Sequence, residues 1–315
     1  MKKSNQILLI TDGSLRRTPA VLRAMSLARK LDAVILLRSF EYQRKLAQAT
    51  QQGFDLDAYL RGRRNRLEEF AGQIREEEVT VDCAVVWGAH PAEKIIFEVL
   101  ALKPDLVIKD AAAASIISRA FYSGLDWRLL AECPAPLMLV HSKSRSLPTH
   151  LLAAVDPLDE HGKPHALNAE ILKTAISLSA QCGAELDVAN AYEFTPTAAE
   201  CEYLGWMPDV TLYEEMRKAH AEALYALGKR HGIAPSQMHV LDGDPARAII
   251  GFAETRKVDL VVMGSVYRSP LKHFFIGSTA EGVFDSLGCD VLALKPEGFA
   301  AELAARLESP KPKAA

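Results

Sequence analysis

The residues best suited to bind a ligand lie in the second half of the chain. Gly264 ends an apolar run, and Gly277-Ser278-Thr279 stands just before a stretch with helical periodicity. A glycine at a strand end lets the backbone turn sharply and approach a ligand without a β-carbon. At a helix start, unpaired backbone N–H groups and the positive end of the dipole attract phosphate oxygens, and two hydroxyls add donors. This pattern predicts a phosphate-binding loop.

A carboxylate is expected to face the same loop. Asp156 follows the apolar run 151–155, which begins the second half. Ligands of parallel sheets bind beyond the carboxyl ends of the strands, at the point where the strand order reverses. There Asp156 can accept hydrogen bonds from an adenine amino group or from ribose hydroxyls.

These residues belong to a pattern of strands and helices that occurs twice. Two runs match most closely, because residues 105–108 and 259–262 each carry an aspartate followed by three apolar residues. In the first half we predict strands at 7–10, 33–39, 81–87, 105–109 and 136–141, with helices up to about residue 30, at 55–75, from Pro91 and at 125–132. In the second half we predict strands at 151–155, 184–191, 238–241, 259–264 and 289–292, with a helix from Pro245 capped by Asp244.

Alternating strands and helices predict an α/β fold of two tandem doubly wound domains, each with a parallel sheet. The length of 315 residues agrees with two cores. We expect one domain at 1–144, a second at 150–297 and a C-terminal tail at 298–315. The polar segment 142–150, interrupted by Pro148, is the expected linker.

The second half resembles the universal stress protein family, whose signature is Gly-x-x-Gly, nine residues, then Gly followed by Ser or Thr. Gly264 and Gly277-Ser278 match it, whereas Tyr267 occupies the second glycine. The resemblance covers the whole chain twice and is closest to tandem members. It implies an adenine-nucleotide hydrolase-like fold, an approximate two-fold axis, domains that pair through their final strands, and ATP as ligand. Asp156, Met263, Gly264, Gly277, Ser278 and Thr279 would contact the nucleotide, and Arg268 can supply charge to a phosphate or remain a solvated surface residue.

The first half departs further from that signature. Asp110 replaces the strand-ending glycine, and Phe121 and Tyr122 fall where Gly277 and Ser278 lie in the second half. A carboxylate repels phosphate, and two aromatic rings fill the space that phosphate needs. Asp12 is kept, but by itself it is more often a turn or cap residue than a ligand contact. We therefore predict no nucleotide binding in this half.

Other polar groups have simpler readings. Arginines 61, 63, 64 and 66 precede several glutamates, which favours a solvated helix paired with itself over a basic patch. His161 and His165 have the spacing of metal ligands, yet Gly162 and Pro164 between them oppose a shared helical face, so no metal site is predicted. His90, just before Pro91, is expected to be a cap or surface residue. The apolar loop that holds Tyr203, Leu204, Trp206 and Met207 either packs on the other domain or lines a pocket.

Composition narrows the class of protein. The net charge is −3, and the sequence contains no basic block suited to binding nucleic acid. No apolar run is long enough to span a membrane. The five cysteines, 83, 133, 182, 201 and 289, are scattered, which favours free thiols in a reducing compartment and a cytoplasmic location.

The sequence lacks local support for a catalytic triad, a carboxylate pair or a thiol–imidazole couple. We expect a non-catalytic stress-response protein whose second half senses an adenine nucleotide and which requires no cofactor. Two alternatives remain open, a binding module for an apolar or other non-nucleotide small molecule, and a weak ATPase.

Overall fold

Strands and helices alternate along the chain, as the apolar runs predict. The computed structural model describes residues 5–11, 13–41, 55–111, 124–141, 146–158, 164–193, 210–268 and 274–308. In the first half the elements are β1 (Asn5–Thr11), α1 (Pro19–Leu31), β2 (Ala33–Glu41), α3 (Leu56–Arg75), β3 (Val81–Trp87), α4 (Pro91–Leu102), β4 (Leu106–Asp110), α5 (Gly124–Glu132) and β5 (Leu137–Val140). In the second half they are β6 (His150–Ala154), α6 (Pro164–Cys182), β7 (Glu185–Tyr192), α8 (Val210–Arg230), η2 (Pro235–Gln237), β8 (Met238–Asp242), α9 (Pro245–Arg256), β9 (Leu260–Gly264), β10 (Val266–Arg268), β11 (Phe274–Ile276), α10 (Ser278–Ser286), β12 (Asp290–Leu294) and α11 (Phe299–Glu308).

Several helices begin where local chemistry requires it. Pro91 and Pro245 occupy the first turns of α4 and α9, where the missing N–H would have no partner. The Asp244 side chain accepts a hydrogen bond from the Arg247 backbone N–H at 2.9 Å, so the predicted cap is confirmed. His90 lies at the N-cap of α4, which confirms its expected place, although its side chain makes no capping bond.

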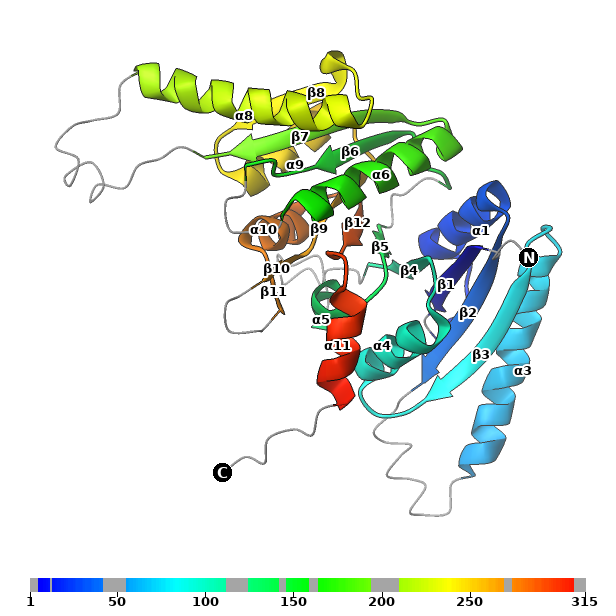
Figure 1. Cartoon of the computed structure of the whole chain (residues 1–315). Coiled ribbons are helices and arrows are strands. Elements are labelled where there is room, and N and C mark those ends of the chain that lie inside the picture. The colour runs from blue at the N-terminus through cyan, green and yellow to red at the C-terminus, as the bar shows by residue number, and fades with distance from the viewer. Residues whose placement is uncertain are drawn as a thin grey trace, which may run out of the picture.

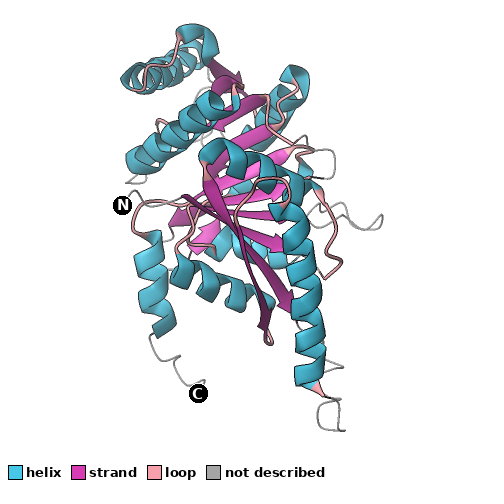
Figure 2. Cartoon of the chain, turned by 90° about the vertical axis from the view of Figure 1, so that its right-hand side faces the viewer, coloured by secondary structure: helices cyan, strands magenta, loops and turns pink. Residues whose placement is uncertain are grey.

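The main sheet has ten strands and runs through both halves (Figures 1 and 2). Its order is β3-β2-β1-β4-β5-β12-β9-β6-β7-β8, so the second half repeats the order of the first in reverse. Neighbouring strands are parallel within each half, whereas β5 and β12 are antiparallel, with Leu139 opposite Val291. The doubly wound fold is therefore confirmed, and the final strands form the seam between the halves.

Two apolar layers cover the two faces of this sheet. Successive strand residues point to opposite faces, so Ile7 and Leu9 enter one layer, while Leu8 and Ile10 enter the other. The first layer receives α1, α3, α6 and α8, and the second receives α4, α5, α9, α10 and α11. Each layer contains residues of both halves. Burial therefore continues across the seam.

A hairpin and a C-terminal helix were not expected from the sequence. Three-residue strands β10 and β11 form a separate antiparallel hairpin after Gly264. Residues 299–308, expected as part of a tail, form α11, whose Phe299 and Leu303 are buried in the second layer. Within the described ranges, no helix combines the length and the apolar character that a membrane crossing requires.

Candidate functional site

A cavity of about 610 Å³ lies at the carboxyl ends of the strands in the second half. It lies beyond the ends of the neighbouring strands β6 and β9 and beside the start of α10, which is the position that the doubly wound topology favours for ligands. Six residues singled out in the sequence line it, namely Asp156, Met263, Gly264, Gly277, Ser278 and Thr279. The structure thus brings the carboxylate and the small-residue helix start to one cavity.

Gly264 has a packing role as well as a place in the cavity wall. A β-carbon built on it would lie 2.7 Å from the Cδ2 atom of Leu167 in α6. The absence of a side chain therefore lets α6 pack close to the end of β9. The sequence indicated a sharp turn toward a ligand, and the structure adds this second reason.

The start of α10 presents backbone donors to the cavity. Gly277 is the N-cap residue, with φ −64° and no side chain to accept a hydrogen bond from the first turn. Ser278 and Thr279 are the first two helical residues and line the cavity with Gly277. This is the arrangement in which helix N–H groups can bind an anion.

The tip of β6 is fixed by a residue that sequence reasoning missed. The Asn168 side chain in α6 accepts a hydrogen bond from the Asp156 backbone N–H at 3.1 Å and donates one to the Asp156 carbonyl at 2.6 Å. An asparagine inside a helix is unfavourable by propensity, and this was the available sequence signal.

Asn190 and His220 form a second set of contacts with the end of β6. Asn190 in β7 donates to the carbonyl of Val155 at 3.2 Å, and its Oδ1 lies 2.7 Å from Nδ1 of His220 in α8. The His220 ring stacks on Tyr192 with 4.3 Å between ring centroids. Burial lowers the pKa of His220, and the charge of Asp156 partly offsets that shift.

The hairpin after Gly264 contains Tyr267, which occupies the position of the second glycine in the family signature. Tyr267 lies in β10 opposite Phe275, so its backbone is that of a strand. This position does not need the left-handed conformation that would demand glycine. Arg268 ends the same strand, and its side chain lies outside the described residues.

The floor of the cavity contacts a lysine that bridges the two halves. Ser265 is fully buried, and its Oγ accepts a hydrogen bond from Nζ of Lys295. The same amine donates to the carbonyl of Leu130 in α5 of the first half. Burial of the amine lowers the pKa of Lys295 to about 7.

The corresponding crevice of the first half is tied together by its own side chains. The Asp110 carboxylate accepts hydrogen bonds from Oγ1 of Thr18 at 2.5 Å and from the Ala20 backbone N–H at 2.9 Å. It therefore links the end of β4 to the start of α1. Asp12, Phe121 and Tyr122, which carried the other expectations for this half, lie outside the described residues.

Arg63 corrects the prediction of a fully solvated arginine helix. Its side chain is buried, and its Nε lies 2.8 Å from Oε1 of Glu41, which is also buried. Its guanidinium also donates to the Gly13 carbonyl at 3.2 Å. Arg61 is exposed and lies 3.8 Å from Asp55, as expected for that helix. Arg63 lies on the same face of α3 as Leu60 and Leu67, so the helical periodicity was a signal for its burial that sequence reasoning missed.

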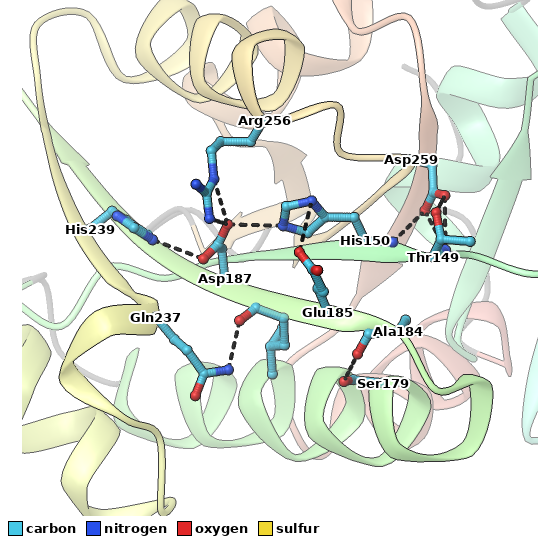
Figure 3. A network of polar contacts seen from close by, with 11 residues as sticks. Thr149, His150, Ser179, Ala184, Glu185, Asp187, Gln237, His239, Arg256 and Asp259 are labelled. Atoms are coloured by element: carbon cyan, nitrogen blue, oxygen red, sulfur yellow. Dashed lines mark hydrogen bonds and ion pairs between the residues drawn. The ribbon is translucent and has the colours of Figure 1, made fainter.

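A separate polar cluster, drawn in Figure 3, lies near the amino ends of β6, β7 and β8. The buried Asp187 in β7 accepts hydrogen bonds from His150 and His239, each at 2.9 Å, and from Arg256. Within the part of the chain that the structure describes, no group of three or more His, Cys, Asp or Glu side chains is arranged to hold a metal. The side chains of His161 and His165 lie outside that part.

Comparisons with known proteins agree with this architecture. A model of the universal stress protein family matches residues 3–141 and again 149–295. Universal stress protein E of Escherichia coli K12 is 30% identical over 305 residues, which cover 95% of this chain and 96% of that protein. A structure of a Pseudomonas aeruginosa PAO1 protein described as functionally unknown is 26% identical, with a TM-score of 0.76, and the match covers 96% and 97% of the two chains. One described as a universal stress protein, from Pseudomonas aeruginosa UCBPP-PA14, is 25% identical, with a TM-score of 0.77 and coverage of 98% and 99%.

Proposed function

The chain belongs to the universal stress protein family, and we propose that its second half binds an adenine nucleotide, ATP in particular, while its first half does not. The observation that carries this proposal is the convergence of Asp156 with Gly277, Ser278 and Thr279 on one cavity. The protein would act in the stress response by sensing the nucleotide, without turning it over.

Each side of the cavity suits a different part of a nucleotide. The backbone N–H groups and hydroxyls at the start of α10 would hold phosphate oxygens. The Asp156 carboxylate would accept hydrogen bonds from ribose hydroxyls or from the adenine amino group. Met263 and Ile249 give the cavity apolar wall on which a base can lie. Arg268, at the end of β10, would add a positive charge near the phosphates.

The proposed role is binding, because the reactive pair beside the cavity is poorly placed for turnover. Ser265 and Lys295 resemble a nucleophile with its base. However, Ser265 is 0% exposed, and the Lys295 amine is also bonded to the Leu130 carbonyl. A substrate atom would have to displace packed side chains to reach the hydroxyl. A weak ATPase is the corresponding alternative.

An apolar ligand is the second candidate, and the character of the walls supports it. Much of the lining is aliphatic, including Leu167, Ile171 and Ile276 besides Met263 and Ile249. Such a surface also suits a small apolar molecule with few polar groups. Mass spectrometry of compounds released from the purified protein distinguishes this candidate from a nucleotide.

Calorimetric titration with ATP, with and without magnesium, tests the proposal on the wild type and on Gly277→Glu. The site tolerates a side chain, because a β-carbon at Gly277 meets no atom within 4 Å and its φ is −64°. The added carboxylate should repel phosphate and weaken ATP binding by at least about tenfold. Gly288→Glu is the matched control, since Gly288 also has open space and does not line the cavity.

The outcomes separate the candidates. Binding that is lost in Gly277→Glu and kept in Gly288→Glu supports a nucleotide site, and phosphate release then shows whether ATP is also hydrolysed. Wild-type protein that shows no heat of binding at millimolar ATP, neither released nor absorbed, contradicts the proposal and leaves the apolar ligand. A cytoplasmic location also belongs to this proposal. It is supported by the free thiols of Cys83, Cys133, Cys182 and Cys289.

A further inference from the structure

We propose that Asn168, Asn190 and His220 are positioning residues, which hold the tip of β6 so that the Asp156 carboxylate faces the ligand. The inference rests on the proposed function, because it concerns the same cavity. None of these residues belongs to the glycine-rich motif.

Asn168 fixes Asp156 through two hydrogen bonds to its backbone. Its amide uses both polar atoms on one residue, accepting from the Asp156 N–H at 3.1 Å and donating to the Asp156 carbonyl at 2.6 Å. The Asn168 residue is 4% exposed, so its rotamer is set by packing. The Leu158 backbone N–H also donates to Oδ1 of Asp156 at 3.3 Å, which orients the carboxylate itself.

Asn190 and His220 restrain the preceding residue by a two-step chain. Because Nδ2 of Asn190 donates to the Val155 carbonyl, its Oδ1 is left to accept from His220. Nδ1 of His220 therefore carries the hydrogen. Asn190 is 1% exposed and His220 9% exposed. His220 does not line the cavity, so it would affect a ligand without contacting it.

The first half serves as an internal control for these contacts. Ile7 lies opposite Ile35 in β1 and β2, and Leu151 lies opposite Leu186 in β6 and β7. Extending this register places Ser39 at the position of Asn190, and Ser39 bonds to Glu41 instead of to the strand tip.

The counterpart of Asn168 behaves in the same way. The Ser-Leu pairs 26–27 and 177–178 align α1 with α6, which places Arg17 at the position of Asn168. Arg17 pairs with Glu77 at the end of α3. The first half thus folds without these asparagine hydrogen bonds, which we call the asparagine bracket. The bracket occurs in the half that contains the described cavity. We infer that it serves the ligand rather than the fold.

The test combines amide hydrogen exchange in the ligand-free protein with calorimetric titration of ATP. Asn168→Leu removes both bonds, so exchange at the Asp156 amide should quicken and ATP should bind about tenfold more weakly. Asn168→Asp keeps an acceptor for that amide but loses the donor to the Asp156 carbonyl. It should retain slow exchange and yet bind ATP more weakly.

His220→Phe separates positioning from direct contact. Phenylalanine keeps the ring on Tyr192 but cannot donate to Asn190, and we expect ATP to bind about three- to tenfold more weakly. Arg17→Leu is the control and should alter neither readout.

Two results would overturn the proposal. One is unchanged Asp156 exchange in Asn168→Leu, and the other is ATP affinity equal to wild type in both Asn168→Leu and His220→Phe. If wild-type protein binds no ATP, the proposed function fails by itself, and the exchange readout then decides whether Asn168 holds Asp156.

Discussion

Nη2 of Arg23 lies 2.6 Å from Oδ2 of Asp290, and the two side chains are 0% and 1% exposed. Arg23 belongs to α1 of the first half, and Asp290 begins β12 of the second half. The other oxygen of Asp290 accepts a hydrogen bond from the His141 backbone N–H, just after β5, at 2.8 Å. One carboxylate of the second half therefore fixes a helix and a strand end of the first.

Removing one partner of this buried pair should destabilise the protein strongly. Arg23→Met leaves the Asp290 carboxylate without its cationic partner, and we expect the free energy of unfolding to fall by about 3–5 kcal/mol in urea denaturation. Arg29→Met is the control, because Arg29 forms an exposed pair with Glu77 and should cost about 1 kcal/mol or less. Equal losses in the two variants would refute a special role for the buried pair.

Asp110 is expected to stabilise the first half as a helix cap. Asp110→Gly restores the glycine of the second half but removes the acceptor of the Ala20 N–H and of the Thr18 hydroxyl. The free energy of unfolding should drop by about 1–2 kcal/mol. Titration should detect no second ATP site, since Phe121 and Tyr122 still occupy the positions of Gly277 and Ser278 in the sequence. A gain of ATP binding in the first half would show that Asp110 alone closes that crevice.

The Asp187 cluster should make stability depend on acid pH (Figure 3). Burial by itself would raise the pKa of Asp187, but hydrogen bonds from His239, His150 and Arg256 outweigh burial and lower the pKa below 3.8. The stabilisation is therefore complete above that value and is lost as pH falls through the lower folded-state pKa.

Asp187→Asn tests this dependence. The variant should be less stable than wild type by roughly 1–3 kcal/mol at pH 7, and the gap should narrow below pH 4 because the wild-type carboxylate becomes protonated. Urea denaturation across the acid range in which the protein stays folded measures it. Glu170→Gln, which alters an exposed pair with Lys173, should match wild type throughout. A gap that stays constant with pH would contradict the assignment.

His220 should lower stability on mild acidification. Burial lowers its pKa below 6.5, so the unfolded chain takes up a proton before the folded protein does. Stability is retained above pH 6.5 and falls as pH drops from 6.5 toward the folded-state pKa, by at most about 1.4 kcal/mol per pH unit. Thermal unfolding between pH 7.5 and 5.5 should show a smaller slope in His220→Phe than in wild type. Identical slopes would contradict a lowered pKa for His220.

Local patterns predicted the elements well because the forces that define them act over a few residues. Apolar runs set the strands, and residues such as Pro245 and Asp244 set a helix start. The strand predicted at 81–87 is β3 in full. The seam between β5 and β12 followed from family resemblance. The hairpin of β10 and β11 escaped prediction because three-residue strands carry too little periodicity.

The candidate site was predictable to the extent that it depends on backbone and small residues. Asp156 and the start of α10 were found from their places at strand and helix ends. The two hydrogen bonds of Asn168 to Asp156 were not predicted, because they depend on how α6 packs against β6. Arg63 was misread although its spacing from Leu60 and Leu67 places it on the buried face of α3. Its partner Glu41, 22 residues earlier in β2, could not be identified from local sequence.

The antiparallel seam has an evolutionary consequence. In a dimer of identical chains, every substitution appears twice, once on each side of the symmetry axis. Here both sides of the axis are encoded separately, so Asp110 and Gly264 can differ at equivalent positions without disturbing the pairing of β5 with β12. The two halves can therefore change independently of each other at such positions.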